Sequence, residues 1–101
     1  MNEPEVVHDK SRRVFHITLG EKEARLRYKM RDENTIDLIS TYVPKEFRGK
    51  SYAKDLVTTA LNYARQNNFD VIATCPYVQS FLKRNSAEYK DLNWVISGEE
   101  S

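Results

Sequence analysis

The amino-acid sequence predicts one α+β domain: a mostly antiparallel sheet, then a helix, a further strand and a shorter C-terminal helix. Hydrophobic residues alternate with polar ones in the first half of the chain, and from Ser51 their period lengthens to that of a helix. The apolar run Phe69–Thr74 then suits a buried strand. At 101 residues the chain is expected to be a single domain, residues 1–101, with a core over about residues 6–96.

Three long strands and one short strand are expected in the first half. Val14–Leu19 alternates, and Gly20–Lys22 makes a plausible hairpin turn into Ala24–Arg31, which has the clearest alternation in the chain. Its polar positions are all basic, and the pattern fits a strand with one face in water: Arg25, Arg27, Lys29 and Arg31. Thr35–Val43 is rich in β-branched and aromatic residues, and the short strand falls near Val6–Val7.

The second half predicts a crossover. From Ser51 to about Arg65, apolar residues recur at helical spacing, and Asn67-Asn68 suits the end of a helix because Asn tolerates a left-handed cap. The strand Phe69–Thr74 should lie parallel to the strand before that helix, joined to it by a right-handed connection. Pro76 suits the first turn of the short helix.

Charge and composition exclude several functional classes. Sixteen Lys and Arg against fifteen Asp and Glu give a net charge of +1, which is no signature of a nucleic-acid or membrane protein. The chain starts without the basic segment and long apolar run of a signal peptide, so a cytoplasmic location is expected. No metal site is predicted, because Cys75 is the sole cysteine and neither His8 nor His16 shows ligand spacing with it.

The stretch "VPKEFRGKSYA", residues 43–53, leads from a strand into a helix through several cations and one glycine. The first turn of a helix has unpaired N–H groups and a partial positive charge, so it prefers an anion. Gly49 would allow close backbone approach, and Arg48, Lys50 and Lys54 would add positive potential. Alternatively, Gly49 only makes the turn and the cations are solvated.

The runs "VPKEFRGKSYAKDLVTTALNYAR" and "VIATCPYVQSFLKRN" resemble small, single-domain members of the GCN5-related N-acetyltransferase superfamily, over a span from Phe15 to Leu92. The resemblance implies that the last long strand splays from its parallel neighbour and leaves a cleft for acetyl-CoA. In that superfamily the turn has Arg or Gln, two residues, Gly, one residue, then Gly or Ala. Here Arg48 and Ala53 match, and Ser51 stands where the first small residue is usually glycine.

The resemblance implies transfer of an acetyl group from acetyl-CoA to an unidentified amine, with backbone amides near Tyr42 and Val43 as oxyanion donors. The residues expected to bind the cofactor are Tyr42, Val43, Arg48, Gly49, Lys50, Ser51, Tyr52, Ala53, Lys54 and Asn85. Asn85 could equally be a helix cap. Many relatives carry a histidine where this chain has Ser40, so a base at that place is absent here.

Cys75 and Tyr77, both in the "CPYV" segment, are the candidate catalytic residues. A cysteine at a helix N-terminus could accept the acyl group or relay a proton, or it could be a small buried apolar residue. Tyr77 and Tyr89 are candidates to protonate the departing thiolate, with Tyr77 favoured only as a lining residue.

Acetyl-CoA and a small-molecule or protein amine are the expected partners, and no nucleic acid or membrane is expected. The protein is expected to be a monomer or a weak homodimer. One alternative is a protein that binds coenzyme A with little or no catalysis. Another alternative is a binding module that uses the basic stripe. The stripe lacks interleaved aromatic residues for base stacking, which argues against nucleic acid as its ligand.

Overall fold

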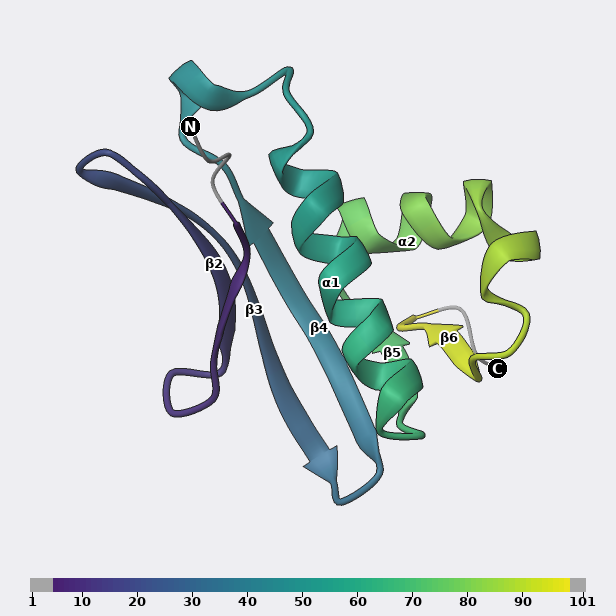
Figure 1. Cartoon of the computed structure of the whole chain (residues 1–101). Helices are drawn as coiled ribbons and strands as arrows, with labels where there is room; N and C mark the ends of the chain where they lie inside the picture. Colours follow the sequence, from purple (N-terminus) through teal and green to yellow (C-terminus); the bar gives the residue numbers. More distant parts are fainter. Residues whose placement is uncertain (1–4, 99–101) are drawn as a thin grey trace.

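The structure is a computed structural model that describes residues 5–98 (Figure 1). These residues form a six-stranded sheet in the order β1-β2-β3-β4-β5-β6, so each strand lies beside its neighbours in the sequence. The strands are β1 (Val7–Asp9), β2 (Val14–Leu19), β3 (Lys22–Asp32), β4 (Thr35–Tyr42), β5 (Asp70–Ala73) and β6 (Trp94–Ile96). The helices are α1 (Tyr52–Gln66) and α2 (Pro76–Arg84), with 3₁₀ turns at Lys45–Phe47 and Ser86–Tyr89. None of the helices among these residues is long and apolar enough to cross a bilayer.

The antiparallel half of the sheet agrees with the alternation in the sequence. Strands β1 to β4 pair antiparallel in succession. The turn between β2 and β3 begins at Gly20, whose φ of 64° is in the left-handed region that glycine enters without a steric penalty. The predicted strands are therefore confirmed, with bounds shifted by a residue or two.

The parallel half has one strand more than was predicted. β5 pairs parallel with β4 after the α1 crossover, as expected, and β6 pairs parallel with β5 after α2. β6 was not predicted because three residues are too few to show a two-residue period.

The core lies between the sheet and the helices. α1 buries Leu56, Val57, Ala60, Leu61 and Ala64 and contacts β2 through β5. α2 buries Val78, Phe81 and Leu82 and contacts β4 and β5. α1 ends as the sequence predicted: Asn67 is its C-cap, and Asn68 has a left-handed φ of 59°.

Both helices cover one face of the sheet. The two crossovers run in the same direction across the sheet, and right-handed crossovers of that kind place their helices on the same side. Cross-strand partners share a face, so Leu26 and Thr41 lie on the helix side. We call the opposite side the open face; on it lie Val7, His16, Arg25, Arg27, Lys29, Tyr42 and Val95.

Candidate functional site

The splay between β4 and β5 is the feature from which the site is built. Their pairing ends at Leu38 and Ala73, where the Leu38 carbonyl accepts hydrogen bonds from the amides of Thr74 (3.1 Å) and Cys75 (2.9 Å). The β3–β4 register shifts at this point and leaves Ile39 as an extra, bulged residue. From Ser40 to Tyr42, β4 is paired with β3 alone among the described strands. Its other backbone edge therefore faces the gap.

A buried carboxylate holds the two strands together where they part. The side chain of Asp37 on β4 is fully buried. Thr74, just after β5, donates from Oγ1 to Asp37 Oδ1 at 2.6 Å, and Arg31 Nε donates to Oδ2 at 2.8 Å. Sequence reasoning did not single out Asp37. An acidic residue inside the apolar run Ile36–Ile39 was the available signal, because a buried charge needs partners.

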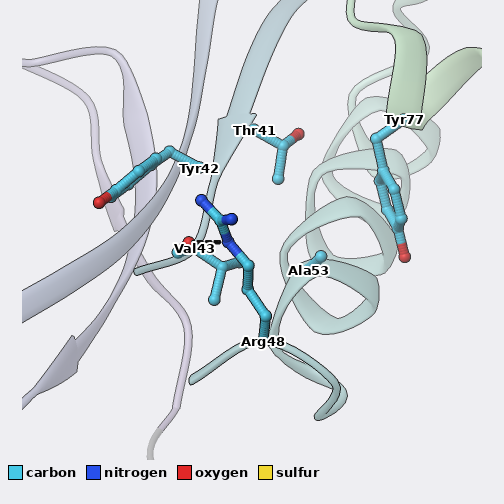
Figure 2. Close-up of a pocket in the computed structure, with 6 residues that line it drawn as sticks. All are labelled: Thr41, Tyr42, Val43, Arg48, Ala53 and Tyr77. Carbon is cyan, nitrogen blue, oxygen red and sulfur yellow. Dashed lines mark hydrogen bonds between the residues drawn. The ribbon is translucent and has the colours of Figure 1, made fainter. Parts of the chain in front are cut away.

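A pocket of about 270 Å³ opens between the end of β4 and the start of α1. It is lined by Thr41, Tyr42, Val43, Arg48, Ala53 and Tyr77 (Figure 2). The structure thus brings together five residues that the sequence analysis had named, from three separate segments of the chain, and adds Thr41. Figure 2 shows the Thr41 side chain and the Tyr42 ring pointing to opposite sides of β4.

Thr41 connects the pocket to Cys75. The Thr41 Oγ1 atom lies 3.3 Å from Cys75 Sγ, and either atom can be the donor. Cys75 is the N-cap residue of α2 and is 3% exposed. The thiol was expected at the mouth of the cleft, and it instead lies within the core and reaches the pocket through Thr41.

Arg48 is folded back onto the end of β4. Its Nε donates to the Val43 carbonyl at 2.8 Å, and Figure 2 shows the guanidinium between β4 and α1. This bond closes the loop that carries the 3₁₀ turn Lys45–Phe47, and it fixes the turn against the strand end.

The turn before α1 is open to solvent at Gly49, Lys50 and Ser51. Gly49 has a φ of 84°, and the first helical bond joins the Asp55 amide to the Ser51 carbonyl at 2.8 Å. The amides that precede Asp55 in the first turn have no partner within the helix. The Ser51 hydroxyl donates to the Asp55 carboxylate at 3.1 Å, and its oxygen accepts no hydrogen bond from the first-turn amides, so Ser51 does not cap them.

The remaining predicted residues lie around this turn or beside it. Tyr52 is half-buried and packs edge-to-face on Phe47 at 6.3 Å between ring centroids. A second pocket of about 280 Å³ is lined by Lys54, Tyr77, Phe81, Arg84 and Asn85. Tyr77 lines both pockets, so residues from the turn and from the "CPYV" segment meet there. Asn85 also donates from Nδ2 to the Phe81 carbonyl at 2.9 Å, which is the helix-end role that the sequence left open.

Tyr89, the other tyrosine considered, lies away from both pockets. It is buried between the Phe81 ring, 6.0 Å away, and Arg65, whose guanidinium carbon is 5.1 Å from the Tyr89 ring centroid. Burial and the neighbouring Glu88 carboxylate raise the pKa of the Tyr89 hydroxyl. These surroundings fit a packing role for Tyr89.

The fold and the site together define a class of protein. It is an α+β fold in which a splayed parallel strand pair and a helix N-terminus form one cleft, as in acyl-CoA-dependent transferases. The sequence model of the GCN5-related N-acetyl-transferase family matches residues 14–92, and the chain belongs to that family. It is 38% identical to Protein NATD1 of Danio rerio over 82 residues, which span 79% of this chain and 74% of that protein. Protein NATD1 of Homo sapiens is 34% identical over 82 residues, 79% of this chain and 73% of its own length.

The fold is also found among solved structures. The NMR structure of a GCN5-like protein from Staphylococcus aureus superposes with a TM-score of 0.74 at 25% identity, over 99% of this chain and 96% of that one. The sequence-based assignment to this superfamily and the predicted fold are thereby confirmed.

Proposed function

We propose that this protein binds acetyl-CoA in the gap between β4 and α1 and transfers the acetyl group to an amine. The observation that carries the proposal is that the pocket and the unpaired first-turn amides of α1 are adjacent, joined by the Arg48 bond to Val43. An elongated ligand with an anionic end and a narrow arm that can hydrogen-bond to the unpaired edge of β4 fits such a combination.

The anionic part of the cofactor is assigned to the turn that contains Gly49, Lys50 and Ser51. Backbone amides and the helix dipole favour a pyrophosphate there, and Arg48, Lys50 and Lys54 add positive charge around it. The arm and the thioester are assigned to the unpaired edge of β4, with Tyr42, Val43, Ala53 and Tyr77 around them. Tyr52 and Asn85 are assigned supporting contacts to the cofactor.

The acyl transfer needs an oxyanion donor and a path for protons. Amides near Tyr42 and Val43 are our choice of donor. For Cys75 we propose a nucleophilic role. Its sulfur forms a bond to the acetyl carbonyl carbon, the bond from that carbon to the cofactor sulfur breaks, and the Cys75 proton goes to the cofactor thiolate. The amine nitrogen then forms a bond to the acetyl carbon, the bond from that carbon to the Cys75 sulfur breaks, and an amine proton goes to the Cys75 thiolate. Thr41 holds and passes this proton, because its hydroxyl is 3.3 Å from the sulfur.

A second function, coenzyme A binding with little catalysis, is favoured by one observation. Cys75 is 3% exposed and does not line the pocket, so its thiol is not open to a bound thioester.

The two functions separate in one experiment. Purified protein is incubated with acetyl-CoA and a panel of amines, free thiol is measured, and the intact protein is weighed by mass spectrometry after incubation with acetyl-CoA alone. The transferase predicts thiol release with some amine, and a Cys75 nucleophile predicts one added acetyl group that Cys75→Ala lacks. Binding with no thiol release on any amine would favour the binding protein.

A further inference from the structure

The open face carries positive charge that the protein does not neutralise itself. The carboxylates near it have partners: Asp37 bonds to Arg31 and Thr74, Glu23 lies 3.0 Å from Arg12, and Asp9 accepts from Ser11. Asp70, also on this face, is on β5 and accepts from Asn93 at 3.3 Å. Among residues 5–98, no carboxylate oxygen lies within 4.0 Å of a cationic nitrogen of Arg25, Arg27 or Lys29. These three alternate residues lie along one side of β3, about 6.8 Å apart by strand geometry.

The same face carries the exposed large apolar side chains of the described chain. They are Val7 (48% exposed), Tyr42 (45%) and Val95 (48%). The pairings Val7–His16, His16–Arg25 and Arg25–Tyr42 form one row across four strands, and Val95 reaches the same face through Ile72 and Asp37. Apolar Val7 and Tyr42 therefore lie in the same row as cationic Arg25 on an uncovered part of the sheet.

We propose that the open face is a docking surface for an extended acidic segment of a partner protein. An extended chain repeats its side chains every second residue at about the spacing of Arg25, Arg27 and Lys29, so carboxylates at alternate positions meet these cations in register. Apolar residues of the segment contact Val7 and Tyr42.

A peptide fits this face better than nucleic acid does. Bases bind to sheets by stacking on free aromatic rings. One face of the Tyr42 ring is already occupied by the Arg25 guanidinium, whose carbon lies 5.1 Å from the ring centroid. The inference goes beyond the proposed function, since it requires neither acetyl-CoA nor catalysis. Because Tyr42 lies on the open face and also lines the pocket, a docked segment lies next to the site.

The test is fluorescence anisotropy with a labelled peptide of alternating Glu and Val, compared with a Gln-for-Glu peptide and a single-stranded oligonucleotide of equal charge. The variant is Arg27→Gln/Lys29→Gln, because both side chains are exposed and, within residues 5–98, the one hydrogen bond or ion pair of either side chain is the 3.5 Å bond from Arg27 to Ser40. The matched control is Lys10→Gln/Lys90→Gln, which removes the same charge from exposed residues outside the open face.

We expect salt-sensitive binding of the Glu peptide, weakened about tenfold in Arg27→Gln/Lys29→Gln and unchanged in the control. Charge reversal, Arg27→Glu/Lys29→Glu, should transfer binding to a Lys peptide. Equal loss in both double variants, absence of binding, or tighter binding of the oligonucleotide would overturn the proposal. Acetyl-CoA binding, measured on the same variants, should be unaffected, so failure of this inference is distinguishable from failure of the proposed function.

Discussion

The contact between Thr41 and Cys75 joins a residue that lines the pocket to the residue proposed to react. The hydroxyl and the thiol lie 3.3 Å apart, and Cys75 is in the core. A buried thiol with one polar neighbour depends on that neighbour for its proton and its orientation. The chemistry proposed here therefore rests on two side chains that lie 34 positions apart.

Replacing Cys75 with Ala should abolish acetyl transfer while leaving the affinity for acetyl-CoA nearly unchanged. Thr41→Val should lower the transfer rate by about 10²-fold, the lower range for loss of proton-transfer assistance. Turnover by thiol release and affinity by calorimetry measure the two effects, with Thr59→Val on α1 as the matched control. Wild-type turnover in Cys75→Ala would rule out the nucleophile.

His8 gives the fold a pH dependence. Its Nε2 lies 2.6 Å from the Tyr28 hydroxyl, and its ring stacks on Phe15 at 4.2 Å. Burial, helped by Lys10, lowers the His8 pKa below 6.5. The unfolded chain then binds this proton at a higher pH than the folded one, so the stability due to neutral His8 is present above pH 6.5 and is lost as pH falls from 6.5 through the folded pKa.

Urea unfolding between pH 8 and pH 5 checks this effect. The free energy of unfolding should fall more steeply with acidification in the wild type than in His8→Gln, and the difference should be confined to the range below about pH 6.5. Parallel curves for the two proteins would contradict the assignment.

At the scale of elements, the turn before α1 and the end of the β4–β5 pairing create the site together. The turn presents the unpaired first-turn amides of α1, and the end of the pairing separates β4 from β5. Each depends on one position that can be changed without touching the pocket lining: Gly49 in the turn and Asp37 at the splay.

Gly49→Ala should destabilise the fold by about 1 kcal/mol, because an alanine is strained at a φ of 84°. A Cβ at Gly49 would meet no atom within 4 Å, so the cost is in the backbone. We expect acetyl-CoA affinity to fall as well. Gly20→Ala is the control: it has φ 64° and equally open surroundings, but lies in the β2–β3 turn, so it should cost similar stability and leave affinity unchanged. Equal affinities in both variants would count against the anion-binding turn.

Asp37→Ala should lower the free energy of unfolding by about 1–3 kcal/mol, since the Thr74 hydroxyl loses its acceptor. The ion pair itself adds little, because the Arg31 side chain is 52% exposed and screened by water. Urea unfolding measures the change, with Asp32→Ala at the exposed end of β3 as the comparison. A loss no greater than that of Asp32→Ala would show that Asp37 does not anchor the splay.

At the scale of the whole molecule, features with a local sequence pattern could be predicted, and contacts between residues far apart in the sequence could not. Strands β2 to β4, helix α1 and the turn at Gly49 each have a signal within a few residues, and each was predicted. The Thr41–Cys75 contact and the Asp37–Thr74 bond join positions 34 and 37 residues apart, and they depend on where β4 and β5 separate. The basic side of β3 was predicted from its alternation, but which other strands share the open face depends on both crossovers, and the second ends at β6, which was not predicted.

Binding of acetyl-CoA is the central claim, and thermal unfolding with and without the cofactor tests it most directly. A ligand at about a hundred times its dissociation constant stabilises the folded state by roughly 2.7 kcal/mol, which shifts the Tm of a domain of this size by several degrees or more. We predict a saturable rise in Tm with acetyl-CoA that is reduced in Gly49→Ala and retained in Gly20→Ala. No rise at millimolar acetyl-CoA would contradict the assigned cofactor and leave only the fold.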